Sequence, residues 1–223
     1  MRKITKTDAI KIIHDCAVLY GKNLSSKNVL FICTHDGNAD CVETLFMPHN
    51  FMHLTGVGAR VNSDQFFRAA IDNKLSQTDI TLKQNGITEQ KLNVLPQLMS
   101  IHITARMVGD YDNTMPLLIA DKFAGTVTMA MGFVNVNGLF IPKTALKKDV
   151  RDITTVTSRR KVIAIFVKHR RDPEYTRLTY MAKEMFIDDD LLQIVLRNKV
   201  NMQKLTSDFP IPIKPTLDTK IET

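Results

Sequence analysis

The run KVIAIFV at residues 161–167 is the most strongly β-forming stretch of the chain, because Val, Ile and Phe dominate it. An apolar run of this length predicts a strand at the centre of a sheet. Residues 175–181 are a second strand that can pair with it. The sheet is therefore expected to be organised around residues 161–167.

A hairpin is predicted further upstream. Residues 28–34 (NVLFICT) have strand composition, and Asp36-Gly37 supplies a turn position that tolerates positive φ. Residues 41–47 are the expected returning strand. Past Pro116 the pattern predicts strands at residues 117–120, 126–133 and 139–142, a tight turn at Asn137-Gly138, and a short helix or turn at 144–150.

Helical periodicity precedes most of these strands. Residues 5–21 and 62–73 have amphipathic spacing, and a third pattern runs from Thr88 toward Ile103 with Pro96 as a kink or break. Three aspartates at 188–190 open a further helix, where acids suit the helix dipole better than a metal. The fold class is therefore α+β, with N-terminal helices packed on a mostly antiparallel sheet of about four or more strands.

No internal repeat or linker divides the chain, so residues 1–205 are expected to form one domain. Residues 206–223 contain three prolines and predict an extended, mobile C-terminal tail. Neither a secretory signal nor an apolar run of about 18 residues is visible, so no membrane partner is expected. Cys16, Cys33 and Cys41 lack C-x-x-C spacing and fit reduced thiols in a cytoplasm.

The net charge of +7 is concentrated in one part of the sequence. Residues 143–177 contain eleven Lys and Arg against four Asp and Glu, which accounts for the whole excess. Such a segment predicts a polyanionic partner, nucleic acid first, although a solvated charged face without a partner is equally compatible. The cations expected to bind substrate are Arg151, Arg159, Arg160, Lys161, Arg170 and Arg171.

Several kinds of site are missing from the sequence. It contains no G-x-x-x-x-G-K-[ST], no G-x-G-x-x-G, no G-x-S-x-G and no H-E-x-x-H. His35, Asp36 and Asp40 are better explained by a turn than by a metal loop. The sequence therefore predicts neither a metal site nor a cofactor.

The stretch FMHLTGVG at residues 51–58 holds the most interesting candidate. It places His53 inside an apolar run, two residues before Thr55, and an imidazole is well suited to proton transfer near neutral pH. His53 can equally be a hydrogen-bonded core residue, and Thr55 can simply hold the turn at Gly56. With the basic segment, this inventory fits metal-independent cleavage of RNA, in which the 2′-hydroxyl attacks the adjacent phosphorus.

The order of several short motifs resembles the phage barnase–EndoU–colicin–RelE-like (BECR) nucleases, the fourth family in that series. The motifs are residues 51–56 (FMHLTG), 63–76, 91–95, 107–111 (MVGDY), 121–125 (DKFAG), 131–133 (MGF) and 141–149. The resemblance covers roughly residues 25–182. It implies helices followed by a four-stranded antiparallel sheet, and a ribonuclease of phage or mobile-element conflict. An inhibitor or immunity protein is a further partner that such a role allows.

The resemblance also implies roles for individual residues. His53 is the candidate general acid or base, and Thr55 a candidate substrate-binding hydroxyl. Lys143 and Lys168, each near a strand end, are candidates for stabilising the phosphorane, although both can also be ordinary surface lysines. A second catalytic histidine is not evident, which leaves open a non-catalytic module that binds nucleic acid or an acidic protein on the same fold.

Overall fold

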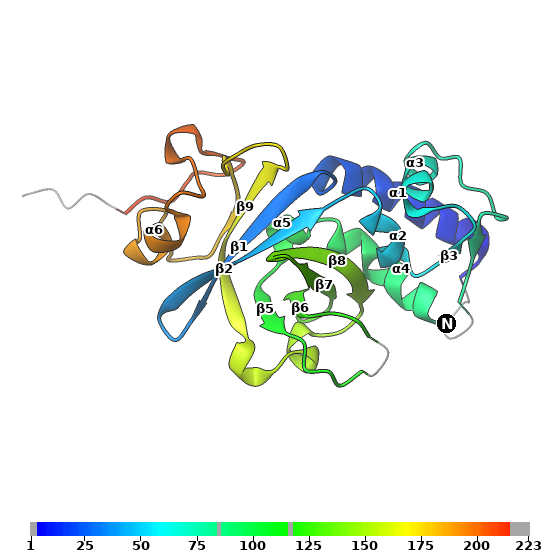
Figure 1. Ribbon diagram of the computed structural model, residues 1–223, viewed down its shortest axis with the longest axis horizontal. Coiled ribbons are helices and arrows are strands. Elements are labelled where there is room, and N and C mark those ends of the chain that lie inside the picture. The colour runs from blue at the N-terminus through cyan, green and yellow to red at the C-terminus, as the bar shows by residue number, and fades with distance from the viewer. Residues whose placement is uncertain (1–3, 84–85, 116–117, 215–223) are drawn as a thin grey trace, which may run out of the picture.

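The computed structural model describes residues 4–83, 86–115 and 118–214, and within them one large mixed sheet organises the molecule (Figure 1). This nine-stranded sheet has the order β1-β2-β8-β7-β6-β5-β9-β10-β11. Its strands are β1 (Lys27–His35), β2 (Asn38–Phe46), β5 (Met107–Asp110), β6 (Lys122–Gly125), β7 (Ala130–Val136), β8 (Leu139–Leu146), β9 (Arg160–His169), β10 (Arg177–Met181) and β11 (Thr206–Ser207). A separate small pair joins β3 (Gly58–Ala59) to β4 (Ile80–Thr81).

The central-strand prediction is confirmed by β9. One of its edges pairs with β1 from Lys161 to His169, while β5 and β10 share the other. Because β1 also pairs with β2, the order from β1 through β2, β8, β7, β6 and β5 returns to β1 by way of β9. The sheet thus closes on itself, and β10 and β11 extend outside the ring.

Most strand pairs are antiparallel, as expected, and the two exceptions are β2–β8 and β10–β11. Three local predictions are wrong in part. Of the strand expected at 126–133, residues 126–129 form the connection between β6 and β7, closed by a bond from the Thr126 amide to the Met129 carbonyl, and the strand begins at Ala130. Among residues 117–120, the described ones (118–120) form no strand, and the main-chain amide of Leu118 bonds the carbonyl of Met115 instead of a neighbouring strand. Leu117 lies outside the described residues. Residues 144–146 are not helix or turn, because β7 offers them continued pairing up to Leu146.

The helices are α1 (Lys6–Asn23), α2 (Asn50–Thr55), α3 (Ser63–Ile71), α4 (Ile87–Leu98), α5 (Ile101–Thr104) and α6 (Asp190–Leu196). Thr5 begins α1 with a reciprocal capping box to Asp8, and Asn62 caps α3. Pro96 lies in the last turn of α4, which ends two residues later. Helices are not confined to the N-terminal part, since α6 follows the sheet.

Two apolar clusters cover opposite faces of β9. The larger one joins α1–α4 to the sheet and includes Val167, whereas a second contains its neighbour Phe166 together with Leu192 of α6. In Figure 1 the helix α6 lies toward one end of the molecule and the helices α1–α4 toward the other, with β1 and β9 running between them. From Ala164 onward, alternate residues of β9 therefore face one cluster or the other, whereas a register shift opposite Ile32 and Cys33 interrupts this alternation at Ile163.

The C-terminal segment is extended from residue 206, but it is attached to the sheet as far as the structure describes it. Thr206–Ser207 pair in parallel with β10, and Phe209 and Ile211 pack on the second apolar cluster. Residues 215–223 lie outside the described part. Among the helices of the described residues, none has both the length and the apolar character needed to cross a bilayer.

Candidate functional site

Helix α2 positions His53. The side-chain oxygen of Asn50 accepts a hydrogen bond from the amide of Met47 at 2.8 Å, and the helix ends at Gly56 in the left-handed conformation, with φ 71°. Phe51 and Leu54 face the core and are fully buried, whereas His53 is half-buried. The ring is therefore neither sealed inside the protein nor free on its surface.

Thr55 lies in the turn rather than toward the cations. It is fully buried, its hydroxyl donates to the carbonyl of Met52 at 2.7 Å, and it accepts from the amide of Val57 at 3.4 Å. Both hydrogen bonds are local. This geometry favours the alternative in which Thr55 holds the turn at Gly56.

Lys91 is a site residue that sequence reasoning missed. Its side chain crosses Gly56, where an added Cβ would lie 2.7 Å from the Lys91 Cδ, and its amine donates to the main-chain carbonyl of His53 at 2.9 Å. Burial, aided by the charge of Lys83, lowers the pKa of Lys91 to about 8. A signal was present in the sequence, because Lys91 occupies the helical position between Ile87 and Leu95 on the apolar side of α4.

Burial and nearby positive charge both act on the His53 ring. Burial lowers the pKa of His53, and the positive charges of Lys143, Lys91 and His49 lower it further. Lys143 lies on β8, against which α2 packs, and His49 lies one helical turn before His53 at the start of α2. At neutral pH the imidazole is therefore uncharged and able to accept a proton.

His49 is a second histidine near His53, which the sequence reading did not single out. The signal was the four-residue spacing, since residues i and i+4 share one face of a helix. Its Nδ1 lies 3.8 Å from the carboxylate of Asp64, the first-turn acid of α3. The site thus contains two imidazoles and two buried or half-buried lysines.

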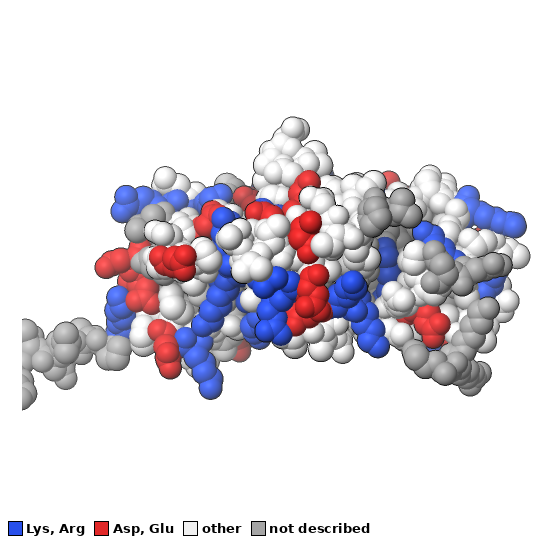
Figure 2. All heavy atoms as spheres, turned by 90° about the horizontal axis from the view of Figure 1, so that it is seen from below, with Lys and Arg blue, Asp and Glu red and all other residues white. Residues whose placement is uncertain are grey.

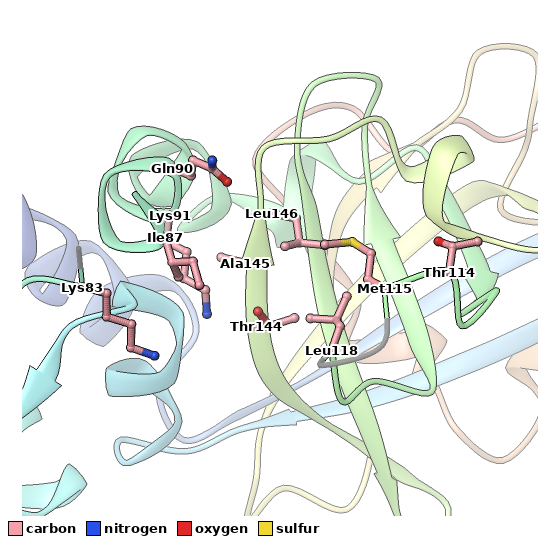
Figure 3. Close-up of a pocket in the computed structure, with 10 residues that line it drawn as sticks. All are labelled: Lys83, Ile87, Gln90, Lys91, Thr114, Met115, Leu118, Thr144, Ala145 and Leu146. Atoms are coloured by element: carbon pink, nitrogen blue, oxygen red, sulfur yellow. The ribbon is translucent and has the colours of Figure 1, made fainter. Parts of the chain in front are cut away.

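A pocket of about 510 Å³ opens beside this cluster, between α4 and β8. Ile87 and Lys91 enter it from the helix, Ala145 points toward them from β8, and Met115 faces Leu146 on the other side of the strand (Figure 3). Its walls are mainly apolar, with the amines of Lys83 and Lys91 at one side. Such a combination of apolar walls and few charged groups is typical of a site for an organic ligand.

Lys168 is not brought to this cluster. Its amine donates to the carbonyls of Asp172 and Pro173 at 2.9 and 3.2 Å and lies 5.1 Å from the ring centre of Tyr175. Tyr175 belongs to the second apolar cluster, on the face of β9 that α6 covers, whereas Phe51 and Leu54 of α2 belong to the first. Lys168 and His53 therefore lie on different sides of the sheet.

The predicted substrate-binding cations divide between the two ends of β9. This strand has ten residues, so its ends are roughly 30 Å apart at about 3.3 Å per residue. Near its start, Arg151 pairs with Asp149 and Arg160 with Asp40 at 2.5 and 2.7 Å, Arg159 donates to the carbonyls of Arg151 and Thr154, and Lys161 is exposed. Arg170 and Arg171 are exposed just beyond its other end.

These cations do not form one uninterrupted basic face. Figure 2, seen from below relative to Figure 1, shows acidic side chains interspersed with the Lys and Arg side chains.

Within residues 4–83, 86–115 and 118–214, no group of three or more His, Cys, Asp or Glu side chains is arranged to hold a metal ion. Among the cations predicted from the sequence, Lys143 is the one whose charge lowers the pKa of His53.

Comparison with known proteins identifies the family. A family model described as phage-Barnase-EndoU-ColicinE5/D-RelE like nuclease4 (PBECR4) matches residues 12–184, a range that includes α2, α4 and β8 and excludes α6. No curated protein and no solved structure matches the chain. The resemblance expected from the sequence motifs is confirmed, and the chain belongs to the fourth family of phage BECR-like nucleases.

Proposed function

We propose that this nuclease-family protein cleaves RNA without a metal ion, at the cluster formed by His53, Lys91 and Lys143. The arrangement that carries the proposal is the half-buried His53 on α2: its main-chain carbonyl accepts from the Lys91 amine at 2.9 Å, and its helix packs on β8, which carries Lys143. Burial and the charges of Lys143, Lys91 and His49 lower the pKa of His53. A neutral imidazole surrounded by cations combines a base with charge stabilisation for an attacked phosphate.

The reaction needs no nucleophile from the protein. His53 takes the proton of the ribose 2′-hydroxyl, and the 2′-oxygen forms a bond to the adjacent phosphorus. The bond from phosphorus to the 5′-oxygen breaks, and Lys91, whose pKa is about 8, donates a proton to that oxygen. Lys143 stabilises the negative charge on the phosphoryl oxygens. The products are a 2′,3′-cyclic phosphate and a free 5′-hydroxyl.

The pocket between α4 and β8 supplies a place for a base next to the scissile phosphate. Its apolar walls, which include Met115 and Leu146, can pack on the faces of a base, and Lys91 is shared between the pocket and the His53 cluster. The exposed cations at either end of β9 then bind the phosphates of the RNA and take no part in the reaction.

The test is cleavage of an end-labelled RNA oligonucleotide in the presence of EDTA. The expected result is a 2′,3′-cyclic phosphate product, no cleavage of the same sequence as DNA, and a loss of at least about 10²-fold in rate for His53→Ala. A matched control is His35→Ala, since His35 is exposed in the distant β1–β2 turn.

Two results would overturn the proposal. Cleavage of the DNA oligonucleotide at a similar rate would exclude the 2′-hydroxyl as the nucleophile. Intact RNA under all metal-free conditions, together with salt-dependent binding that His53→Ala leaves unchanged, would instead identify a binding module on the same fold.

A further inference from the structure

We propose that a small cavity between the end of α1, helix α5 and strand β10 is a binding site for a phosphate group, separate from the His53 cluster. The cavity measures about 70 Å³. Its lining side chains come from α1, β1, α5, β9 and β10, and they are Lys22, Asn23, Lys27, His102, Val167, Arg177 and Thr179. None of them lines the pocket beside Lys91 or contributes to the pKa shift of His53.

His102 supplies an unused hydrogen-bonding atom. The residue is 9% exposed, and its Nδ1 is buried with no hydrogen-bond partner. A buried polar atom left in this way destabilises the fold, because it has lost its hydrogen bonds to water. Burial, together with the charges of Lys27 and Arg177, lowers the pKa of His102 to about 4, so the ring is neutral near pH 7. A neutral ring protonated on Nδ1 can donate one hydrogen bond to a phosphate oxygen.

Positive charge in the cavity exceeds negative charge. Lys22, Lys27 and Arg177 line it. The carboxylate of Asp208 pairs with Arg177 at 2.6 Å and is largely exposed. Burial lowers the pKa of Lys27, and the positive charge of Arg177 lowers it further, so these two cations repel each other. An anion between them would remove that repulsion.

The remaining polar groups of the cavity are already used. The Thr179 hydroxyl lies within hydrogen-bond distance of the carbonyls of His102 and Ile165, and the Asn23 amide donates to the carbonyl of Met99 at 3.1 Å. The Lys27 amine donates to the carbonyl of Lys22, and Arg177 pairs with Asp208, but each keeps further N–H groups. Together with Lys22 and the His102 ring, they form a set of donors suited to an oxyanion. The volume fits one tetrahedral anion or about two waters at roughly 30 Å³ each, and is far below the several hundred Å³ of an organic-ligand site.

Titration with inorganic phosphate against chloride at equal ionic strength tests the site. Millimolar phosphate is expected to raise the Tm of the protein above its value in chloride and to shift the imidazole NMR signals of His102. Lys27→Gln and Arg177→Gln should each weaken phosphate binding about tenfold or more, because each removes a charge-assisted contact. Lys183→Gln is the matched control, since Lys183 is exposed and does not line the cavity.

Further variants keep the result interpretable. Lys27→Arg retains the charge and should retain most of the binding, which separates loss of the site from loss of the fold. His53→Ala should bind phosphate as the wild type does, so failure of the proposed ribonuclease activity leaves this inference standing. Equal effects of phosphate and chloride, or unchanged binding in both Lys27→Gln and Arg177→Gln, would overturn it.

The source of the phosphate is distinguished with DNA oligonucleotides, which lack the 2′-hydroxyl. If the site takes a terminal phosphate, a 5′-phosphorylated oligonucleotide should bind about tenfold more tightly than the unphosphorylated one, and Lys27→Gln should abolish the difference. If it takes free phosphate, the two oligonucleotides bind alike and inorganic phosphate alone shifts the His102 signals. Either result supports a phosphate site.

Discussion

The amine of Lys91 donates a hydrogen bond to the main-chain carbonyl of His53 across 2.9 Å, and the stem that carries it passes directly over Gly56. The two residues come from α4 and α2, so this bond ties the helix that bears the imidazole to the helix that lines the pocket. Because Gly56 has no side chain, the lysine can lie close enough to reach the end of α2. The position of Lys91 therefore depends on a residue that takes no part in chemistry.

Gly56→Ala is expected to lower activity more than stability. An alanine at φ +71° costs roughly 1–2 kcal/mol, and its Cβ would displace the flexible Lys91 stem and break the bond to His53. Misplacement of the amine should reduce the cleavage rate by about 10- to 100-fold. Gly37→Ala is the matched control, since it has φ +79° with open space around it. Urea unfolding and RNA cleavage of both variants would check this; equal activity would contradict it.

The pH–rate profile should be bell-shaped. Activity is expected to fall on the acid side as His53 becomes protonated, at a pH below 6.5 because its pKa is lowered, and on the alkaline side near pH 8 as Lys91 loses its proton. Lys91→Arg should be slower and lack the alkaline limb, because an arginine stays protonated. If Lys91→Arg keeps that limb, another group, with His49 the first candidate, donates the proton.

Lys143→Gln is expected to lower kcat by about 10²- to 10³-fold with little change in Tm, because it removes a charge that stabilises the transition state. Lys147→Gln serves for comparison, since Lys147 is exposed just after β8 ends. Single-turnover cleavage at saturating enzyme isolates the chemical step. A similar, small effect of both substitutions would place the phosphate elsewhere.

His102 should make the protein less stable in acid. Its pKa is about 4 in the folded protein and 6.5 as an unperturbed group, so between these values the unfolded chain binds a proton that the folded protein does not. The free energy of unfolding should therefore fall as pH decreases from 6.5 to 4, by up to about 3 kcal/mol. His102→Gln should flatten this part of the curve, whereas His35→Gln should not. Urea unfolding in phosphate-free buffers at several pH values measures it.

Elements with local signals could be predicted from the amino-acid sequence. The β-branched run at 161–167 indicated β9, Asp36-Gly37 indicated the β1–β2 turn, and the helical spacing of 5–21 indicated α1. The order of short motifs also indicated the family, since motif order needs no knowledge of contacts. His53 could be named as a candidate from the sequence, because an imidazole within an apolar run is visible without coordinates.

Which side chains lie near one another could be seen only in the folded protein. Lys143 and Lys168 looked alike as lysines near strand ends, but Lys168 faces the α6 side of β9, while β8 packs on α2 and brings Lys143 to His53. The basic segment was continuous in sequence and is divided in space, because an extended strand of ten residues separates its two halves. Contacts between distant elements depend on how the sheet closes, and no local pattern of residues encodes that closure.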